Sequence, residues 1–221
     1  SLTISGRDKR VFVHGKTKEK VDKIVKKNND RNFPSEGLVH DIKEIQPFIE
    51  KVRPVLPIHI LVLSYGPLLE KEIDTMSFQD WENMYLYNAI MPGMLISLCL
   101  PGMIKEGYGK IILFGGTGTG TVYGYKKIPA YASAKAGLSI IAKSIAKKYG
   151  SKGITCNVIS PGFAATEYYT STQIEHLKNK IGSERLIKPK EIAEVVKFLI
   201  SDSGDVINGA TVPVNKGIDH I

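Results

Sequence analysis

A tyrosine and a lysine four residues apart are the pair in this chain best suited to proton transfer. Tyr131 and Lys135 bracket the pentapeptide Tyr-Ala-Ser-Ala-Lys, inside a pattern typical of a helix. Residues i and i+4 share one face of a helix, so the phenol and the ammonium can point into one cleft. A free tyrosine has a pKa of about 10, but a fixed cation nearby favours the phenolate and lowers that pKa. The pair therefore predicts a group that exchanges a proton with a carbonyl or alcohol oxygen near pH 7.

Apolar runs alternate with helical patterns along the chain, and this alternation predicts how the pair is held. The expected strands span residues 10–14, 37–40, 58–64, 110–114, 154–159 and 211–214. One helix is expected directly after Thr17, which can cap it. Further helices are expected at 42–52, 77–104, 129–150, 172–181 and 189–200. Repeated strand–helix alternation is typical of an α/β fold, a doubly wound parallel sheet with helices on both faces. We expect residues 1–221 to form one domain.

Small or polar residues follow several of the expected strands. They are Lys16, Asp41, Ser64 to Gly66, the loop 115–121 and Pro161 to Phe163. In a doubly wound sheet the ligand lies beyond the carboxyl ends of the strands. These residues are therefore expected to converge with Tyr131 and Lys135 at one edge of the sheet.

The composition is that of a soluble globular protein, with 43% hydrophobic and 24% charged residues. The longest uncharged apolar stretch, 89–104, is shorter than the ~20 residues of a membrane span, so we expect a buried helix and no membrane partner. No signal peptide pattern is visible at Ser1 to Thr3. Cys99 and Cys156 lie in apolar contexts and are interpreted as buried thiols. A cytoplasmic protein without a metal site is the expectation.

A net charge of +8 and a lysine-rich segment raise the alternative of nucleic-acid binding. The lysines of residues 16–27 are interspersed with Val21, Ile24 and Val25, whose spacing is helical. We interpret these lysines as the solvated face of a helix. No aromatic residues interleave with them to stack on bases, so no nucleic-acid partner is expected.

The motifs resemble those of the short-chain dehydrogenase/reductase family from about Arg10 to Gly217. Tyr131 and Lys135 match the family's Tyr-x-x-x-Lys motif, and Asn88 matches its helix asparagine. Asn157 to Gly162 resemble the family's stretch beside the nicotinamide, and Thr166 resembles the threonine that contacts its carboxamide. Asp41 resembles the family's aspartate near the adenine, and Val214 to Gly217 resemble its C-terminal segment.

The resemblance implies a Rossmann-like fold and an enzyme that transfers a hydride between a nicotinamide cofactor and a small carbonyl or alcohol substrate. Tyr131 would donate or accept the proton, and Lys135 would lower its pKa and hold the nicotinamide ribose. Asn88 would support a proton-relay water; an alternative is a hydrogen bond that patches a helix distortion ahead of Pro92. The family also implies a homodimer or homotetramer, in which the apolar helices 89–104 and 130–146 contact partner subunits.

The resemblance assigns a set of residues to the cofactor. They are Lys16, Asp41, Ile42, Ser64, Gly66, Tyr131, Lys135, Pro161, Gly162, Phe163 and Thr166. An acid at the end of the second family strand would accept the ribose 2′-hydroxyl and repel a 2′-phosphate. The segment Val13 to Lys16 contains no acid, and Lys16 can pair with a phosphate. The expected cofactor is therefore NADP, with NAD less favoured.

The segment ahead of Arg10 departs from the family pattern. The family has a glycine-rich loop and a crossover helix after its first strand, and only nine residues precede Arg10. We expect Leu2 to Ser5 to occupy the first-strand position, with the loop and helix either deleted or outside this sequence. If they are deleted, NADP would bind poorly.

Two further departures concern the site itself. The family's catalytic serine aligns with Gly116, so Thr117 or Thr119 is expected to supply the hydroxyl, unless both merely decorate a substrate-side loop. Tyr65 is a bulky replacement that would crowd the adenosine ribose. Aromatic residues are expected to line an apolar substrate pocket: Tyr123, Tyr125, Phe163, Tyr168 and Tyr169. These departures keep open an alternative function, a catalytically impaired family member that acts as a binding or assembly protein.

Overall fold

The computed structural model describes residues 11–15, 17–30, 35–39, 45–120, 123–166, 169–181 and 184–217. The chain divides into two compact units, residues 1–57 and 58–221. Several predictions lie outside the described residues, namely the strand at 2–5 and the site residues Lys16, Asp41 and Ile42. Tyr168 lies outside them as well.

The first unit contains a strand–helix–strand motif. Strand β1 (Val11–Gly15) and strand β2 (Ser35–Val39) are parallel and are joined by helix α1 (Lys18–Asn29), and helix α2 (Ile45–Val52) follows. The side chain of Val21 is only 1% exposed and lies against Gly37, where a Cβ would come within 2.5 Å of it. Thr17 lies at the N-cap of α1, but its side chain makes no capping hydrogen bond, so that prediction was wrong. The helix instead begins on the backbone carbonyl of Thr17, which accepts from the Val21 N–H.

The second unit is built on a parallel four-stranded sheet in the order β3-β4-β5-β6. The strands are β3 (Ile60–Leu63), β4 (Gly109–Phe114), β5 (Ile154–Pro161) and β6 (Thr211–Val214). Central strand β4 is apolar on both faces, and Ile111, Ile112 and Leu113 are fully buried. A strand that is apolar on both faces requires cover on both sides. The expected parallel sheet is confirmed for this unit.

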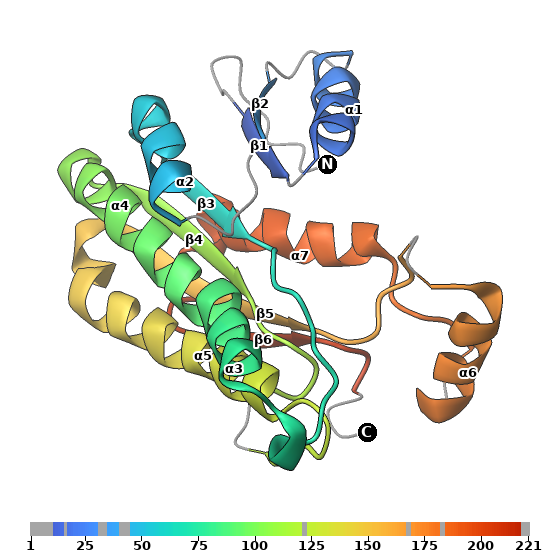
Figure 1. Ribbon diagram of the computed structural model, residues 1–221. Helices are drawn as coiled ribbons and strands as arrows, with labels where there is room; N and C mark the ends of the chain where they lie inside the picture. Colours follow the sequence, from blue (N-terminus) through green and yellow to red (C-terminus); the bar gives the residue numbers. More distant parts are fainter. Residues whose placement is uncertain are drawn as a thin grey trace. The chain divides into compact units, whose positions relative to one another are not determined.

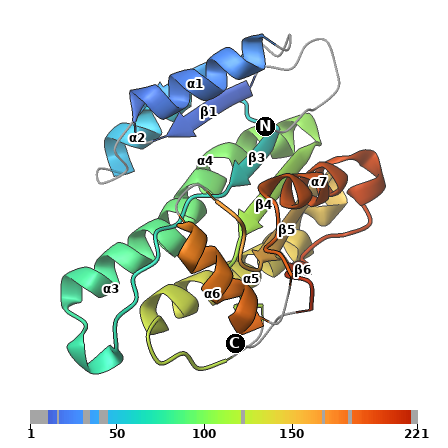
Figure 2. The same cartoon turned by 90° about the vertical axis from the view of Figure 1, so that its right-hand side faces the viewer.

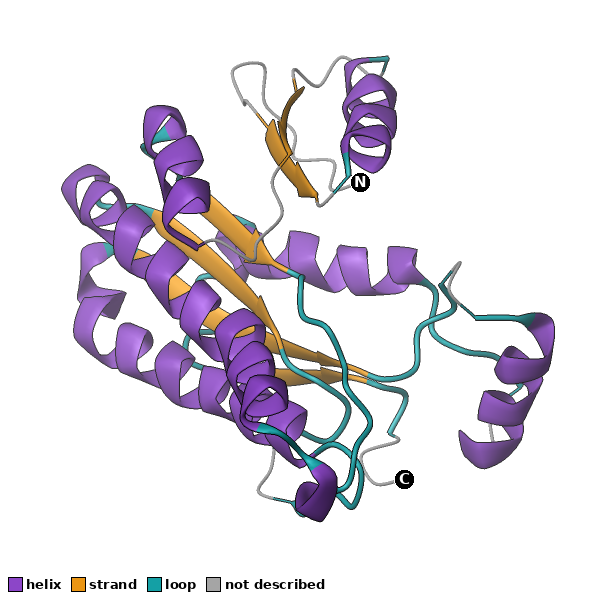
Figure 3. Ribbon diagram, in the orientation of Figure 1, coloured by secondary structure: helices purple, strands orange, loops and turns teal. Residues whose placement is uncertain are grey.

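Helices cover both faces of this sheet (Figure 1). Helix α3 (Phe78–Tyr85), a π-helical turn (Leu86–Ile90) and helix α4 (Met91–Glu106) form one continuous run, and α4 and helix α5 (Pro129–Tyr149) pack on one face. Helix α7 (Pro189–Ile200) packs on the other face, while helix α6 (Ser171–Ile181) stands apart at the carboxyl end of the strands (Figures 2 and 3).

The long apolar helix is buried along one stripe. In α4 the residues Met91, Leu95, Cys99 and Met103 recur every four positions, and all are buried. The run Phe78–Glu106 is long and apolar enough to cross a membrane by length and composition alone, and 39% of its most apolar window is buried. A core helix of a soluble protein meets the same criterion, so this is weak evidence for a span. Cys99 is a free buried thiol, as predicted, and burial raises its pKa to about 11.

Candidate active site

The carboxyl ends of β3, β4 and β5 bring the predicted site residues of the second unit together. Gly66 follows β3, Gly116 follows β4, and Pro161 ends β5. Tyr131 and Lys135 lie one turn apart at the start of α5, which begins at Pro129. Proline suits the first helical turn because the N–H that it lacks has no partner there.

Asn88 and Lys135 both lie against the backbone of Gly66. A Cβ placed on Gly66 would fall 2.4 Å from Asn88 Oδ1 and 2.5 Å from Lys135 Nζ. Real Cβ atoms do not approach other atoms this closely, so no other residue fits at position 66 without a shift. The predicted convergence of Gly66, Asn88 and Lys135 is therefore present in the geometry.

Asn88 lies in the π-helical turn, where the helix is widened just ahead of Pro92. Its Nδ2 donates to the carbonyl of Pro67 at 3.1 Å, a residue outside the helix. The expected distortion exists, but the Asn88 amide does not patch it by bonding to helix backbone. Asn88 Oδ1 is buried and has no hydrogen-bond partner among the described residues. A buried acceptor without a donor is suited to a water or a ligand hydroxyl.

Lys135 is a buried cation. The residue is only 3% exposed, and its Nζ donates a hydrogen bond to the carbonyl of Phe114 at 2.8 Å. Burial lowers the pKa of Lys135 to about 8, because removing an ammonium from water disfavours its charged form. The ammonium lies 5.9 Å from the centre of the Tyr131 ring.

The pKa of Tyr131 differs from the expectation in direction. Burial raises it to about 12, with further contributions from Tyr125 and Tyr169. The expected lowering by Lys135 is not found, because desolvation of the buried phenol is the largest effect on its pKa. Tyr131 is therefore a protonated phenol at neutral pH in this state of the protein.

The loop after β4 is fastened by hydroxyl groups. Thr117 Oγ1 donates to the carbonyl of Pro161 at 3.1 Å, and Tyr125 donates to the carbonyl of Thr117 at 2.9 Å. Thr119 Oγ1 accepts from the Gly116 N–H and donates to the Gly116 carbonyl. The buried Ser160 also donates to that carbonyl, at 2.5 Å. Sequence reasoning gave Ser160 no separate role, although its place directly before Pro161 is a usable signal.

Comparison with known proteins agrees with this geometry. A family model described as enoyl-(acyl carrier protein) reductase matches residues 10–219. A 3-oxoacyl-(acyl-carrier-protein) reductase FabG of Buchnera aphidicola is 30% identical over 208 residues, which cover 90% of this chain and 81% of the relative. The FabG of Escherichia coli is 33% identical over 184 residues, covering 81% and 75%.

The chain belongs to the short-chain dehydrogenase/reductase family. Solved structures share the fold: an oxidoreductase of this family from Burkholderia thailandensis has a TM-score of 0.81 at 24% identity, covering 96% of this chain and 83% of that one. A gluconate 5-dehydrogenase from Burkholderia cenocepacia, solved with NADP and tartrate, has a TM-score of 0.81 at 22% identity, covering 94% and 84%. The expected Rossmann-like α/β fold is thereby confirmed.

Against the family pattern, the glycine at the serine position is tightly packed. A Cβ on Gly116 would lie 2.9 Å from both the hydroxyl oxygen and Cε1 of Tyr131. A side chain at this position therefore requires the Tyr131 ring to move. The position of the Tyr131 phenol is therefore compatible with glycine at position 116 and with no larger residue.

The other predicted residues that the structure describes follow β3 and β5. Ser64 is exposed just after β3, and Tyr65 packs edge-on against Tyr87 with ring centres 6.1 Å apart. The N–H of Gly162 donates to the carbonyl of Val214 at 3.0 Å. Phe163 and Thr166 accept backbone hydrogen bonds from Ile187 and Tyr169 respectively. Their roles toward a cofactor stay predictions.

The low pKa of Lys135 predicts a distinctive dependence of stability on pH. The folded protein loses this proton at about 8, whereas the unfolded chain keeps it up to 10.5. As the pH increases between these values, the free energy of unfolding of the wild type should rise relative to that of Lys135→Met, by up to about 1.4 kcal/mol per pH unit, because only the unfolded chain still binds the proton. Urea unfolding of both proteins at several pH values measures this difference. Parallel curves across the window would show that Lys135 is not a buried cation.

Proposed function

We propose that this protein is an NADP(H)-dependent oxidoreductase that transfers a hydride between the nicotinamide and the carbonyl or alcohol carbon of a small substrate. The observation that carries the proposal is the approach of Gly66, Asn88 and Lys135 to one another beside Tyr131. Family membership and this arrangement support the same chemistry.

The described residues fit a bound nicotinamide cofactor. A Cβ would fall 2.9 Å from the Cα of Asn215 at Gly162 and 2.4 Å from Asn88 Oδ1 at Gly66, so bare backbone is presented at both positions. Gly66, Pro161, Gly162 and Thr166, with Ser64 and Phe163, would hold the cofactor. When bound, the cofactor supplies or accepts the hydride. NADP rather than NAD is proposed because no acid precedes Lys16 at the end of β1.

The side chains of the site then act on the proton. Tyr131, protonated at neutral pH, is suited to donate its proton to the oxygen of a carbonyl, which favours the reductive direction. Lys135 holds a positive charge beside that phenol and stabilises negative charge on either oxygen. The unpartnered Oδ1 of Asn88 would accept from a water that resupplies the proton.

A 3-oxoacyl thioester is the substrate class we propose to test first. The curated relatives at 30–33% identity carry the name 3-oxoacyl-(acyl-carrier-protein) reductase. An apolar acyl chain also suits the aromatic side chains near Tyr131, where Tyr123 and Tyr125 meet edge to face at 5.2 Å. Acetoacetyl-coenzyme A is a suitable small probe of this class.

Removal of one hydroxyl tests the proposed acid. Tyr131→Phe keeps the ring and its packing, so the unfolding midpoint should change little. Turnover of acetoacetyl-coenzyme A with NADPH should fall about 10²–10⁴-fold, because a positioned proton donor is lost. NADPH binding, measured by fluorescence, should persist in both proteins. Equal turnover in Tyr131→Phe and wild type would refute the acid role, and absence of turnover in both would favour the alternative of a binding protein.

Restoring the family serine should impair this site. Gly116→Ser places a Cβ against the Tyr131 hydroxyl, so kcat should fall on the order of tenfold although a hydroxyl is gained. Gly124→Ser is the matched control, because among the described residues, its two chain neighbours aside, no atom lies within 4 Å of a Cβ at Gly124. A Gly116→Ser protein faster than the wild type would contradict the packing argument.

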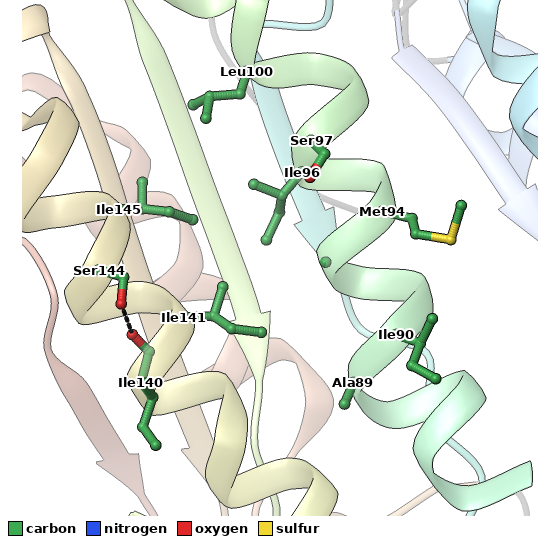
Figure 4. Close-up of a pocket in the computed structure, with 11 residues that line it drawn as sticks. Ala89, Ile90, Met94, Ile96, Ser97, Leu100, Ile140, Ile141, Ser144 and Ile145 are labelled. Atoms are coloured by element: carbon green, nitrogen blue, oxygen red, sulfur yellow. Dashed lines mark hydrogen bonds between the residues drawn. The ribbon is translucent and has the colours of Figure 1, made fainter. Parts of the chain in front are cut away.

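An apolar groove between α4 and α5 is the proposed contact with a second copy of this chain (Figure 4). It is lined by Ala89, Ile90, Gly93, Met94, Ile96, Ser97, Leu100, Ile140, Ile141, Ser144 and Ile145. Ile140 is 69% exposed and Ile90 47% exposed, so this face is unburied in the single chain. A continuous apolar face of this kind marks an interaction surface, and the family resemblance implies a homo-oligomer.

The groove predicts that the protein forms a dimer or tetramer. It also predicts that a single charge introduced into the groove disrupts this assembly. Sedimentation at micromolar concentration should give a multiple of the 24.3 kDa chain. Ile140→Lys should shift the protein toward the monomer, because an unpaired charge in an apolar interface is costly. Val206→Lys is the control, since Val206 is 89% exposed and lies outside the groove. A wild type that sediments only as the monomer would contradict the assignment.

A further inference from the structure

Four hydroxyl groups in or beside the described part of the loop after β4 already donate hydrogen bonds. A hydroxyl has a single hydrogen to donate. Thr117 and Tyr125 donate theirs to the carbonyls of Pro161 and Thr117, and Thr119 and Ser160 donate theirs to the carbonyl of Gly116. None of these four is therefore in place to donate to a substrate oxygen without breaking a bond that fastens the loop.

The peptide between Gly116 and Thr117 is different. Its carbonyl oxygen accepts from Ser160 Oγ at 2.5 Å, from Thr119 Oγ1 at 2.9 Å and from the Thr119 N–H at 3.1 Å. Its N–H, on Thr117, has no hydrogen-bond partner in the part of the chain that the structure describes. A trans peptide directs its N–H away from its carbonyl, so this donor faces away from Ser160 and Thr119.

The surrounding turn holds this N–H in a fixed direction. The bond from the Thr119 N–H to the Gly116 carbonyl closes a four-residue turn, and Gly118 has a φ of 72°. Thr117 is not among the non-glycine residues with positive φ, so the turn is of type II, with Thr117 at its second position. Hydrogen bonds accepted by a carbonyl also polarise its peptide and make the N–H a stronger donor.

The N–H lies next to the phenol. The nitrogen of Thr117 is two covalent bonds from the Cα of Gly116, and a Cβ on that atom would lie 2.9 Å from the Tyr131 hydroxyl. One substrate oxygen can thus reach both the phenol and the amide.

We propose that the backbone N–H of Thr117 replaces the missing serine hydroxyl and donates a hydrogen bond to the substrate oxygen beside Tyr131. This inference rests on the proposed function. As a carbonyl carbon accepts hydride from NADPH, its π bond opens and the oxygen takes the proton of Tyr131, while the Thr117 N–H stabilises the developing negative charge and keeps its own hydrogen. A fixed donor of this kind needs no reorganisation during the reaction.

A proline at Thr117 tests the proposal, because proline is favoured at the second position of a type II turn and lacks the N–H. Thr117→Ala is the matched control, since it removes the hydroxyl and keeps the N–H. With acetoacetyl-coenzyme A and NADPH, kcat of Thr117→Pro should be about 10²–10³-fold below that of Thr117→Ala. NADPH affinity and the unfolding midpoint should be similar in both variants. Tyr169→Phe tests the remaining phenol near Tyr131 and should lose less activity than Thr117→Pro.

The outcomes separate the amide donor from the proposed function. Wild-type turnover with equal kcat in Thr117→Pro and Thr117→Ala would overturn the amide donor alone. A Tyr169→Phe loss larger than that of Thr117→Pro would assign the role to Tyr169 instead. Absence of turnover in the wild type would overturn the proposed function and the donor with it. If Thr117→Pro does not fold, replacing Thr117 by its α-hydroxy acid analogue converts the amide to an ester, keeps the side chain and should give the same loss of kcat.

Discussion

A buried ammonium group at the carboxyl end of the sheet constrains the rest of the site. Lys135 is almost fully enclosed, and its Nζ is held by the carbonyl that ends β4. Enclosing a cation costs free energy unless polar groups face it, and the Phe114 carbonyl is such a group. Lys135 and Asn88 both lie against the bare backbone of Gly66. The π-helical turn ahead of α4 carries Asn88 at this point, and the Pro67 carbonyl fixes its orientation. A local irregularity of the helix is thus part of how the site is built.

The second constraint is the space around the phenol. Since Gly116 leaves no room for a side chain next to Tyr131, the loop cannot present a hydroxyl from that position. Its threonines and Ser160 serve instead to hold the backbone, and they converge on the Gly116 carbonyl. The hydrogen bonds that hold this loop and the crowding of Tyr131 both involve the backbone of Gly116. A polarised backbone amide is the chemical group that such packing leaves for recognition of an oxygen atom.

Patterns local to the chain predicted the elements well. Strand β6 and helix α7 begin and end at the predicted residues, and α5 differs by one residue at its end, because hydrophobic period and proline signals are local properties. The i, i+4 spacing likewise placed Tyr131 and Lys135 on one helix. The direction of the Tyr131 pKa was predicted wrongly, since it depends on burial by segments far away in the chain. The contacts of Ser160 with Gly116 also join distant segments, and spacing along the sequence carries no information on them.

We propose that a hydride of the bound cofactor is transferred to the substrate carbon and that Tyr131 donates a proton to the substrate oxygen. Transfer of deuterium tests that claim most directly. The protein is incubated with acetoacetyl-coenzyme A and with NADPH that carries deuterium at both positions of C4 of the nicotinamide, and the product is analysed by mass spectrometry. We expect one deuterium on C3 of the 3-hydroxybutyryl product, and about 10²–10⁴-fold less labelled product in the same time from Tyr131→Phe at the same concentration. A 3-hydroxybutyryl product without deuterium, or equal amounts of labelled product in the two reactions, would contradict this mechanism.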